Sequence, residues 1–486
     1  MTRPDDPLRI PIAIRAYTES PNKEPVGTLA SADITASPWT VVFDTETAID
    51  AAQRFRFGFY QIRYRDCLRE EGIFYDDNTI PADEEMQIRD FARSRNLALL
   101  TVAEFRTDVF LKYGYTRGGT IVGFNLPFDI SRIAIRHSPA RRSMRGGFSF
   151  ELTRNADDPR VRIKHLSPKS AIIDFAKPGE QDTPRGMRKR GFRVPVNRGH
   201  FVDCKTTAAA LLSRRFSLRS LSACLGTPTQ KHNTDEHGSL SADYLDYARA
   251  DTQVTWECYI NLHGRYAAHH LSRPIDRLLS EASIGKAYIQ AMGIKPFLGC
   301  NPQFPRKYFG EIFSAFYGGR AEVRNRRVIR EVTYCDFKSM YPTVNSLMGL
   351  WEFVIADGLV IEETTAKTQA FLAKVTLTDL QRPECWKKLC TLVRITPDED
   401  IFPVRAAYNG LTNTIGLNRL TAPSPLWLTL ADCIVSKLLT GRCPRIEKAQ
   451  TYHPGPRQSE LAAIRILGKS DFTIDPNTDD FFTRLI

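Results

Sequence analysis

The stretch 41-VVFDTETAID-50 combines a short apolar run with two closely spaced carboxylates. The three apolar residues predict a buried strand that continues directly into Asp44 and Glu46. Because successive strand residues point to opposite faces, the two carboxylates share one face and Thr45 points away from them. Two like charges this close repel each other unless a cation lies between them or water covers both. The question is whether acids elsewhere in the chain complete a metal site.

Length and charge set the broad class of protein. The chain has 486 residues, enough for two or three domains with their own cores, and its apolar share of 42% is typical of globular proteins. The formal net charge is +12 and the isoelectric point is about 9.2. This charge favours a polyanionic partner such as nucleic acid, although a solvated basic surface explains it equally well.

Cysteine usage and hydropathy bear on the compartment. Ten cysteines are scattered without a Cys-x-x-Cys pair, so neither a zinc ribbon nor a disulfide framework is indicated. The sequence contains no signal peptide and no apolar run long enough to cross a membrane. We therefore expect a cytoplasmic protein that has no membrane partner.

Expected strands and helices alternate along the chain, which indicates an α/β (α+β) fold. Strands are expected at 40–45, 120–125, 170–176, 200–206 and 327–337, and helices at 82–96, 129–137, 240–263 and 425–441. Ser239 or Ser241 is expected to cap the helix over 240–263. The segment 184–193 is rich in Arg, Lys and Gly and predicts a basic loop.

Two further segments place acids after a strand or on a helix face. In 123-GFNLPFD-129 the apolar strand ends at Asn125, and Asp129 follows in the first turn of a helix, where an acid suits the helix dipole. In 247-YARAD-251 the tyrosine and the aspartate are four residues apart, so their side chains lie on one helix face. No other Tyr-x-x-x-Asp occurs in the chain.

Each of these signals has an ordinary structural explanation when it is taken alone. A second Asp-x-Glu occurs at Asp83 and Glu85, at the start of an amphipathic helix, where acids complement the dipole. Asp251 alone suits a solvated helix face, and Tyr247 alone suits a half-buried core position. The order of the three segments and their place at strand ends are what favour a shared site.

In that order, the three segments resemble the three exonuclease motifs of the DEDD 3′–5′ exonucleases, in the tyrosine-bearing version found in family B DNA polymerases. The resemblance implies four catalytic, metal-binding acids: Asp44, Glu46, Asp129 and Asp251. It implies that Tyr247 orients the attacking water. It also implies a set of residues that hold the single-stranded 3′ end of DNA: Thr47, Asn125 and Phe128. The fold implied is an RNase-H-like exonuclease domain with a mixed sheet and flanking helices.

The chemistry of phosphodiester hydrolysis explains these residue types. A water must be activated, and the leaving 3′ oxygen must be stabilised as it gains negative charge; two divalent ions roughly 3.5–4 Å apart do both. Hard ions such as Mg²⁺ or Mn²⁺ prefer oxygen ligands, which fits four acids without a His or Cys cluster. An aromatic face at Phe128 can stack on a base regardless of its identity.

The stretch 315-AFYGGRAEVRNRRVIREVTYCDFKSMYPTVNSLM-348 carries two more patterns. The segment Tyr317-Gly318-Gly319-Arg320 resembles the Tyr-x-Gly-Gly segment of protein-primed family B polymerases, which contacts the template strand; an ordinary glycine turn beside a solvated basic strand is the alternative. The segment 336-DFKSMYP-342 resembles polymerase motif A. This resemblance implies that Asp336 holds Mg²⁺ and the incoming dNTP, and that Tyr341 stacks under the sugar.

Motifs B and C of family B polymerases are not found between residues 343 and 486. We therefore expect the N-terminal part of a protein-primed-like family B DNA polymerase with an intact exonuclease, inactive in synthesis unless a second polypeptide supplies fingers, motif C and thumb. A terminal protein is a further partner implied for this family, and a plasmid, phage or viral origin is compatible with it. Two alternatives stay open: a stand-alone DEDD exonuclease that uses the palm remnant to bind DNA, and a noncatalytic DNA-binding remnant.

The resemblance and the secondary-structure pattern together predict four parts of the chain. They are an N-terminal leader strand with loops at 1–36, the exonuclease domain at 37–265, a helical connector with the Tyr-Gly-Gly-Arg segment at 266–326, and a partial palm at 327–486.

Overall fold

A computed structural model of the protein describes residues 11–17, 35–176, 199–230, 240–320, 325, 327–337, 339–407, 413–468 and 471–484. The chain divides into two compact units, one of Pro25–Tyr288 and one of Met1–Glu24 together with Ile289–Ile486. The fold is mixed α/β with several sheets, as the alternation in the sequence predicts. The finer division into four parts stays a prediction, and the basic loop expected at 184–193 lies outside the described residues.

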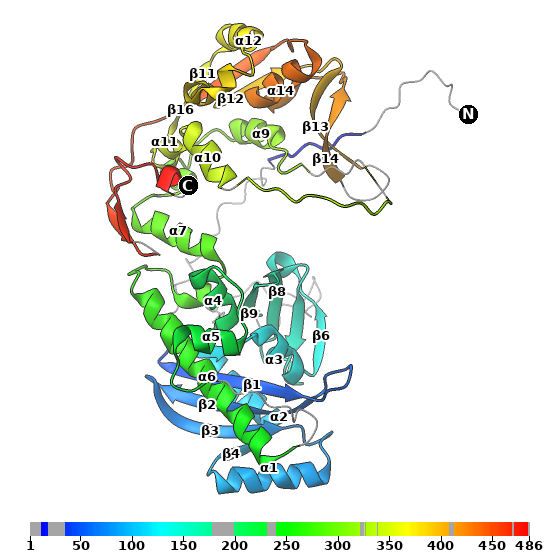
Figure 1. Ribbon diagram of the computed structural model, residues 1–486, viewed down its shortest axis with the longest axis vertical. Coiled ribbons are helices and arrows are strands. Elements are labelled where there is room, and N and C mark those ends of the chain that lie inside the picture. Colours follow the sequence, from blue (N-terminus) through cyan, green and yellow to red (C-terminus); the bar gives the residue numbers. More distant parts are fainter. Residues whose placement is uncertain are drawn as a thin grey trace, which may run out of the picture. The chain divides into compact units, whose positions relative to one another are not determined.

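A six-stranded mixed sheet forms the centre of the Pro25–Tyr288 unit, with the strand order β10-β5-β1-β2-β3-β4 (Figure 1). Its strands are β1 (Trp39–Thr47), β2 (Phe55–Tyr64), β3 (Cys67–Tyr75), β4 (Ala98–Thr101), β5 (Thr120–Gly123) and β10 (His200–Asp203). The first three strands are antiparallel to one another, whereas β5 runs parallel to both β1 and β10. The carboxyl ends of β1, β5 and β10 therefore meet at one edge of the sheet.

Helices cover both faces of this sheet. They are α1 (Ala82–Ser94), α2 (Val102–Glu104), the π-helix η1 (Phe105–Thr116), α3 (Leu126–Ile133), α4 (Cys204–Leu212), α5 (Leu218–Leu225) and α6 (Ala242–Ala267). The long helix α6 packs against β1, β2 and β5 of the sheet (Figure 1). Its N-terminus is capped as predicted, because the Ser241 hydroxyl accepts a hydrogen bond from the backbone N–H of Tyr244 at 3.1 Å.

The alternation of β1 decides which core each side chain enters. Val41 and Phe43 pack into the core between the sheet and η1 and α3. Val42 packs on the opposite face, in a core shared with α5 and α6. Asp44 and Glu46 follow the even-numbered positions and so face α6, whereas Thr45 follows the odd-numbered positions and is buried toward α3.

The remaining elements of this unit lie beside the central sheet. A second, antiparallel sheet has the order β6-β7-β8-β9 and consists of β6 (Arg136–Pro139), β7 (Phe148–Glu151), β8 (Val161–Ser167) and β9 (Ser170–Phe175). Short 3₁₀ segments are η2 (Arg142–Met144) and η3 (Ile275–Arg277), and α7 (Glu281–Ala291) spans the point at which the chain divides.

The second unit is built around an antiparallel sheet of order β11-β16-β12-β15 and two hairpins. Its strands are β11 (Leu359–Glu363), β12 (Thr391–Ile395), β13 (Asp400–Ala407), β14 (Asn413–Leu420), β15 (Leu426–Thr429), β16 (Lys448–Pro454), β17 (Ile464–Ile466) and β18 (Phe472–Ile474). Its helices are α8 (Phe297–Cys300), α9 (Arg306–Ala315), α10 (Met340–Leu347), α11 (Leu350–Val354), α12 (Thr365–Lys374), α13 (Pro383–Trp386), α14 (Leu430–Thr440) and α15 (Phe481–Arg484). None of the helices in the described ranges combines the length and hydropathy that a membrane span requires.

Four predicted elements differ from the structure. The helix expected at 129–137 spans Leu126–Ile133, and strand β6 begins at Arg136. The strand expected at 200–206 ends at Asp203, where α4 begins without a loop. The helix expected at 425–441 begins only at Leu430, because Leu426–Thr429 pair with β12 as strand β15. Leu426–Thr429 alternate between buried and half-buried positions, as a half-buried strand does, and the helical pattern that follows had obscured this strand.

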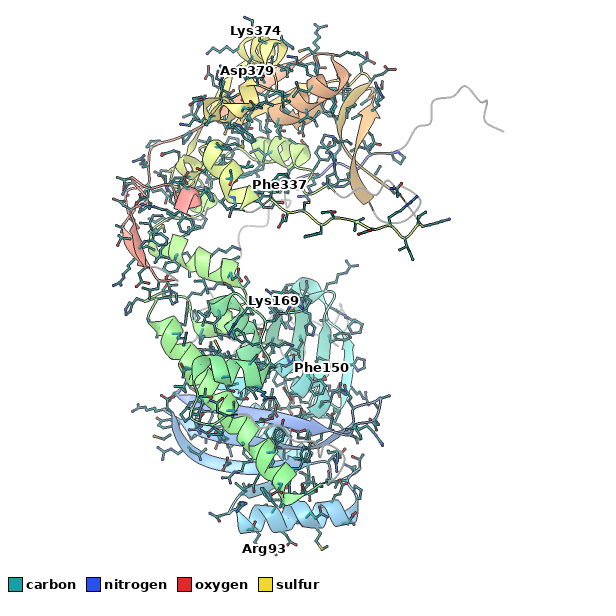
Figure 2. The ribbon with its side chains drawn as sticks, viewed as in Figure 1. Arg93, Phe150, Lys169, Phe337, Lys374 and Asp379 are labelled. Atoms are coloured by element: carbon teal, nitrogen blue, oxygen red, sulfur yellow. The ribbon has the colours of Figure 1, made fainter. Side chains whose placement is uncertain are left out.

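The strand expected at 327–337 is not formed. Ile329, Tyr334 and Phe337 are more than 80% exposed, and none of the strands in the described part of the chain pairs with this segment. Figure 2 shows Phe337 on the extended chain that leads into α10. A strand needs a neighbour to accept and donate its ladder hydrogen bonds, so β-forming residues alone do not produce one.

The pairing of β1 with β2 makes a stability prediction at Gly58, which lies opposite Thr45. A Cβ at this position would lie 2.5 Å from the backbone oxygen of Asp44 and 2.5 Å from Cζ of Phe74. Gly58→Ala should therefore lower the free energy of unfolding by about 1–3 kcal/mol, as overpacking does elsewhere. Urea unfolding monitored by circular dichroism measures the change.

Gly264→Ala is the matched control, because a Cβ on this exposed position of α6 meets nothing within 4 Å. It should raise the free energy of unfolding by about 0.5–1 kcal/mol, since alanine is the better helix former. If both variants unfold like the parent protein, the close approach of β2 to Asp44 is wrong.

Candidate metal centre

Three of the four predicted acids meet at the edge of the central sheet. Asp44, Glu46 and Asp251 each offer a carboxylate oxygen, and these three oxygens lie within 4.8 Å of one another. Asp44 and Glu46 come from the end of β1, and Asp251, which is 2% exposed, comes from the middle of α6. Residues more than 200 positions apart in sequence thus form a group that a divalent cation could bind.

The position of Asp251 is fixed by polar contacts on either side of it along α6. The Arg249 guanidinium pairs with Glu71 of β3 at 2.5 Å, and Gln253 accepts a hydrogen bond from Gln61 of β2 at 3.0 Å. Gln61 is 1% exposed, so its amide is satisfied within this network and not by bulk water. These contacts set the rotation of α6 that presents Asp251 to β1.

Tyrosines on α6 complete the side of the site next to Glu46. The hydroxyl of Tyr244 donates to Oε2 of Glu46 at 2.6 Å, and burial together with this carboxylate raises the pKa of Tyr244 well above its usual range. Tyr247, predicted to orient a water, is half-buried and stacks on Tyr244, with 6.1 Å between ring centroids. The structure therefore places both tyrosines on the face of α6 that carries Asp251.

Asp129 contacts the strand that carries Asp44 and Glu46, but it is not one of the three acids whose ligand oxygens lie within 4.8 Å of one another. Its Oδ1 accepts hydrogen bonds from the backbone N–H of Thr45 at 3.2 Å and from the Thr45 hydroxyl at 2.6 Å. Its Oδ2 is buried and has no hydrogen-bond partner among the described residues. Because Thr45 stands between Asp44 and Glu46 on β1, this contact holds Asp129 against the strand that carries the other two acids.

Burial sets the protonation of Asp129. Desolvation raises the pKa of this carboxyl from an ordinary 3.8 to about 8, and the two hydrogen bonds from Thr45 oppose the shift only in part. The nearby Asp203 carboxyl adds to it. An unpartnered carboxylate oxygen at such a depth is costly in the ionised form, and a bound cation would lower that cost.

The backbone around Asn125 is shaped by a residue that the sequence pattern did not single out. Asn125 adopts a left-handed conformation, with φ 72° and ψ 41°, at the N-terminus of α3. Asp203, at the end of β10, accepts hydrogen bonds from the N–H groups of Asn125 at 2.7 Å and Leu126 at 3.4 Å. It also accepts one from the Thr206 hydroxyl at 2.6 Å. Asp203 thus links the carboxyl end of β10 to the turn that follows β5, the parallel strand beside it.

The other residues predicted to hold a 3′ end lie around the same edge. Thr47 is the last residue of β1, just after the register shift that pairs Glu46 with Phe57 and Thr47 with Phe55. Phe128 is half-buried in α3, and the Arg132 guanidinium lies 4.6 Å from its ring centroid. One face of Phe128 is therefore beside a cation, which restricts where a base could stack on it.

The residues predicted for template and nucleotide binding belong to the other unit. Tyr317 is buried and its carbonyl accepts a hydrogen bond from Arg405 at 2.5 Å, while Gly318 has φ +89°, a conformation that favours glycine. Gly319 and Arg320 are exposed. Asp336 and Tyr341 are exposed as well, and none of the groups of three or more ligating side chains found among the described residues includes Asp336.

The donor set and its environment fit a hard divalent cation. All of the acids offer oxygen, two of them are 2% exposed, and one buried oxygen of Asp129 has no partner among the described side chains. Mg²⁺ and Mn²⁺ both suit such a set, and the geometry does not distinguish between them. Asp44, Glu46 and Asp251 would hold the first ion, and Asp129 is the remaining acid beside the same strand.

Two contributors to the site were missed by the sequence patterns. Tyr244 lies seven residues before Asp251, two helical turns away on the same face, so helical periodicity could have found it. Asp203 ends an apolar strand, as Asp44 does, and its position after 201-FV-202 is the same type of signal. Comparison of the chain with protein-family models and with curated proteins finds no match.

The pKa of Asp129 predicts a pH-dependent stability cost in metal-free protein. Below about pH 4 the carboxyl is protonated in both the folded and the unfolded state, so it costs nothing. As the pH rises toward 8, the unfolded chain releases this proton while the folded protein retains it, and the free energy of unfolding falls. Asp129→Asn removes the titrating group, so the free energy of unfolding of the variant should rise relative to that of the parent protein as the pH increases over this range.

Urea unfolding in EDTA at several pH values measures the difference between the two proteins. Parallel stability curves from pH 4 to pH 8 would show that Asp129 is solvated and not buried. Addition of Mg²⁺ at pH 8 should raise the stability of the parent protein more than that of Asp129→Asn, because the variant has lost a charged ligand.

Proposed function

We propose that the protein is a metal-dependent 3′–5′ exonuclease that acts on single-stranded DNA ends, within the N-terminal part of a family B DNA polymerase. The observation that carries the proposal is the convergence of Asp44, Glu46 and Asp251 to within 4.8 Å. These are residues of two separate motifs that the resemblance to DEDD exonucleases pairs in one site. Asp129, from the third motif, is fixed to Thr45 between the first two acids.

The topology of the central sheet supports an RNase-H-like exonuclease domain. In the order β3-β2-β1-β5-β10, three antiparallel strands are followed by two that run parallel to the first strand of the chain. The acids stand at the carboxyl edge of the parallel strands and on α6, which packs across them. The mixed sheet and its flanking helices agree with what the resemblance implies.

Each residue of the site has its own role in the proposed hydrolysis. Divalent ions, when bound, would supply an activated water and stabilise the leaving 3′ oxygen. The carboxylates of Asp44, Glu46 and Asp251 would hold these ions, and the Tyr244 hydroxyl orients the Glu46 carboxylate by donating to Oε2. Tyr247 is the candidate to orient the attacking water by hydrogen bonding, because a phenol is no strong base at neutral pH. The positive net charge of the chain favours a polyanionic substrate.

The alternative of a self-sufficient exonuclease has its own support. All four acids and both tyrosines lie within the Pro25–Tyr288 unit, which has its own hydrophobic cores on both faces of the sheet. A noncatalytic DNA-binding remnant is less consistent with the site, because three carboxylates with ligand oxygens within 4.8 Å repel one another, and a bound metal ion would offset that repulsion.

Substitutions of the acids test the exonuclease. With a 5′-labelled single-stranded oligonucleotide and Mg²⁺, the parent protein should shorten the strand from its 3′ end. Asp44→Ala should reduce the rate by several orders of magnitude, because it removes a ligand from the metal site. Tyr247→Phe should cost about 10- to 100-fold, since it removes one hydrogen bond and no metal ligand.

Asp83→Ala is the matched control for these variants. Asp83 belongs to the second Asp-x-Glu of the chain, on the exposed first turn of α1, so its loss should leave the rate unchanged. Degradation that persists at the parental rate in the Asp44→Ala, Glu46→Ala double variant would refute the assignment.

A second test concerns DNA synthesis. The isolated chain should not extend a primer with dNTPs, because nucleotidyl transfer needs a metal pair held by two palm carboxylate positions, and only the Asp336 position is found. A polypeptide that supplies motifs B and C should restore extension when it is added. Asp336→Ala should then abolish the restored extension and leave the exonuclease intact. Template-dependent incorporation by the isolated chain would contradict this expectation.

A further inference from the structure

The proposed site carries an excess of negative charge, and this charge repels a DNA strand. Asp44, Glu46 and Asp251 form the metal group, and Asp129 and Asp203 are buried beside it. A DNA strand brings one further negative charge for each phosphate. Ions held by these acids would neutralise charge at the phosphate that is cleaved, whereas a cation of the protein could neutralise the next phosphate along the strand.

Lys205 lies just after the carboxyl end of β10, at the edge of the sheet where β1 also ends. It is the second residue of α4, which follows β10 without a loop, and β10 ends at the same edge of the sheet as β1 and β5. Its Nζ donates to Oδ1 of Asn125 at 3.1 Å, and the side chain is half-buried. Asp203 fixes the two chain segments relative to each other through its hydrogen bonds to the N–H groups of Asn125 and Leu126.

The hydrogen bond between Lys205 and Asn125 uses the amide oxygen of Asn125, so the groups that remain on these two side chains are hydrogen-bond donors. An ammonium group has three donors and no acceptor, so it must face the carbonyl oxygen of the Asn125 amide. The NH₂ group of that amide is thereby turned away from Lys205. Among the described residues, Oδ1 of Asn125 accepts a hydrogen bond from the Lys205 ammonium, whose charge also acts on the buried Asp203 carboxyl and opposes the rise in the pKa of that carboxyl. Remaining N–H donors from both side chains can therefore serve oxygen acceptors outside the protein.

We propose that Lys205 binds a phosphodiester of the DNA strand on the 5′ side of the cleaved bond, with Asn125 as the group that orients its ammonium. This inference rests on the proposed exonuclease function and adds a substrate-binding residue to it. The ligand chemistry follows from the donors: a phosphodiester carries two anionic oxygens and accepts from several donors at once. Lys205 contacts no metal ligand directly, so its role concerns the strand and not the ions.

Salt dependence separates a phosphate contact from a purely structural role. Binding of a labelled oligothymidylate is measured by fluorescence anisotropy at several salt concentrations, with Ca²⁺ in place of Mg²⁺. Loss of one phosphate contact on a single strand reduces the slope of log K against log salt by about 0.7. Lys205→Met should show this reduction, and its KM in Mg²⁺ should rise by about tenfold with a smaller change in kcat, as expected for a lost charged hydrogen bond.

Two further variants make the comparison specific. Lys205→Arg retains the charge and should keep the parental salt slope. Lys112→Met is the control for loss of a positive charge elsewhere, because Lys112 is exposed on η1, just before the amino end of β5 and so at the opposite edge of the sheet. It should leave the slope and KM unchanged.

A chemically altered strand locates the contact. Oligothymidylates with one neutral methylphosphonate linkage should bind the parent protein more weakly when that linkage lies at the contacted position. The same change should have no effect on Lys205→Met, so the two losses are not additive. A parental salt slope in Lys205→Met, or additive losses at every linkage, would overturn the inference while leaving the exonuclease in place. If the parent protein neither binds nor shortens the strand, the proposed function falls and this inference falls with it.

Discussion

Mutual repulsion among carboxylates is the constraint around which the Pro25–Tyr288 unit is built. Three acids with ligand oxygens within 4.8 Å stay together only because the elements that carry them are fixed by other contacts. The register of β1 in the sheet places Asp44 and Glu46 on one face. The pairing of Arg249 with Glu71, and of Gln253 with Gln61, holds α6 against that face. The strand register of β1 and the side-chain contacts of α6 thus hold the negative charges of the site close together.

Contacts on both faces of β1 hold the acids of the site in place. On the α6 side, Tyr244 donates to Glu46 and so satisfies one oxygen of the acid furthest along β1. On the other side, Thr45 donates twice to Asp129. A single Asp-Thr-Glu segment therefore organises acids on both faces, because strand alternation turns its middle residue toward α3. Replacement of Thr45 would consequently affect an acid that no periodicity in the local sequence connects to it.

Much of this arrangement could be predicted from the sequence, and the failures have identifiable causes. The strand at Val41–Phe43, the helix that carries Asp251 and the first-turn place of Asp129 follow from local pattern. The role of Asp203 does not, because a strand-end acid that binds two backbone N–H groups looks in sequence like one that binds a metal. The engagement of Asn125 with Lys205 is also invisible, since it joins residues 80 positions apart through a parallel strand pair.

Two segments of similar composition show why local pattern is insufficient. Residues 40-TVVFDT-45 and 332-VTYCDF-337 both combine β-branched and aromatic residues with an aspartate near the end. The first lies inside a six-stranded sheet with Val42 and Phe43 fully buried, whereas Val332 and Tyr334 of the second are at least 80% exposed. The propensities are alike, so the difference is made by neighbours: β2 and β5 flank the first segment, and no described strand flanks the second. An acid on a strand between partners is held in place and can hold a metal, whereas none of the described strands pairs with the segment that carries Asp336.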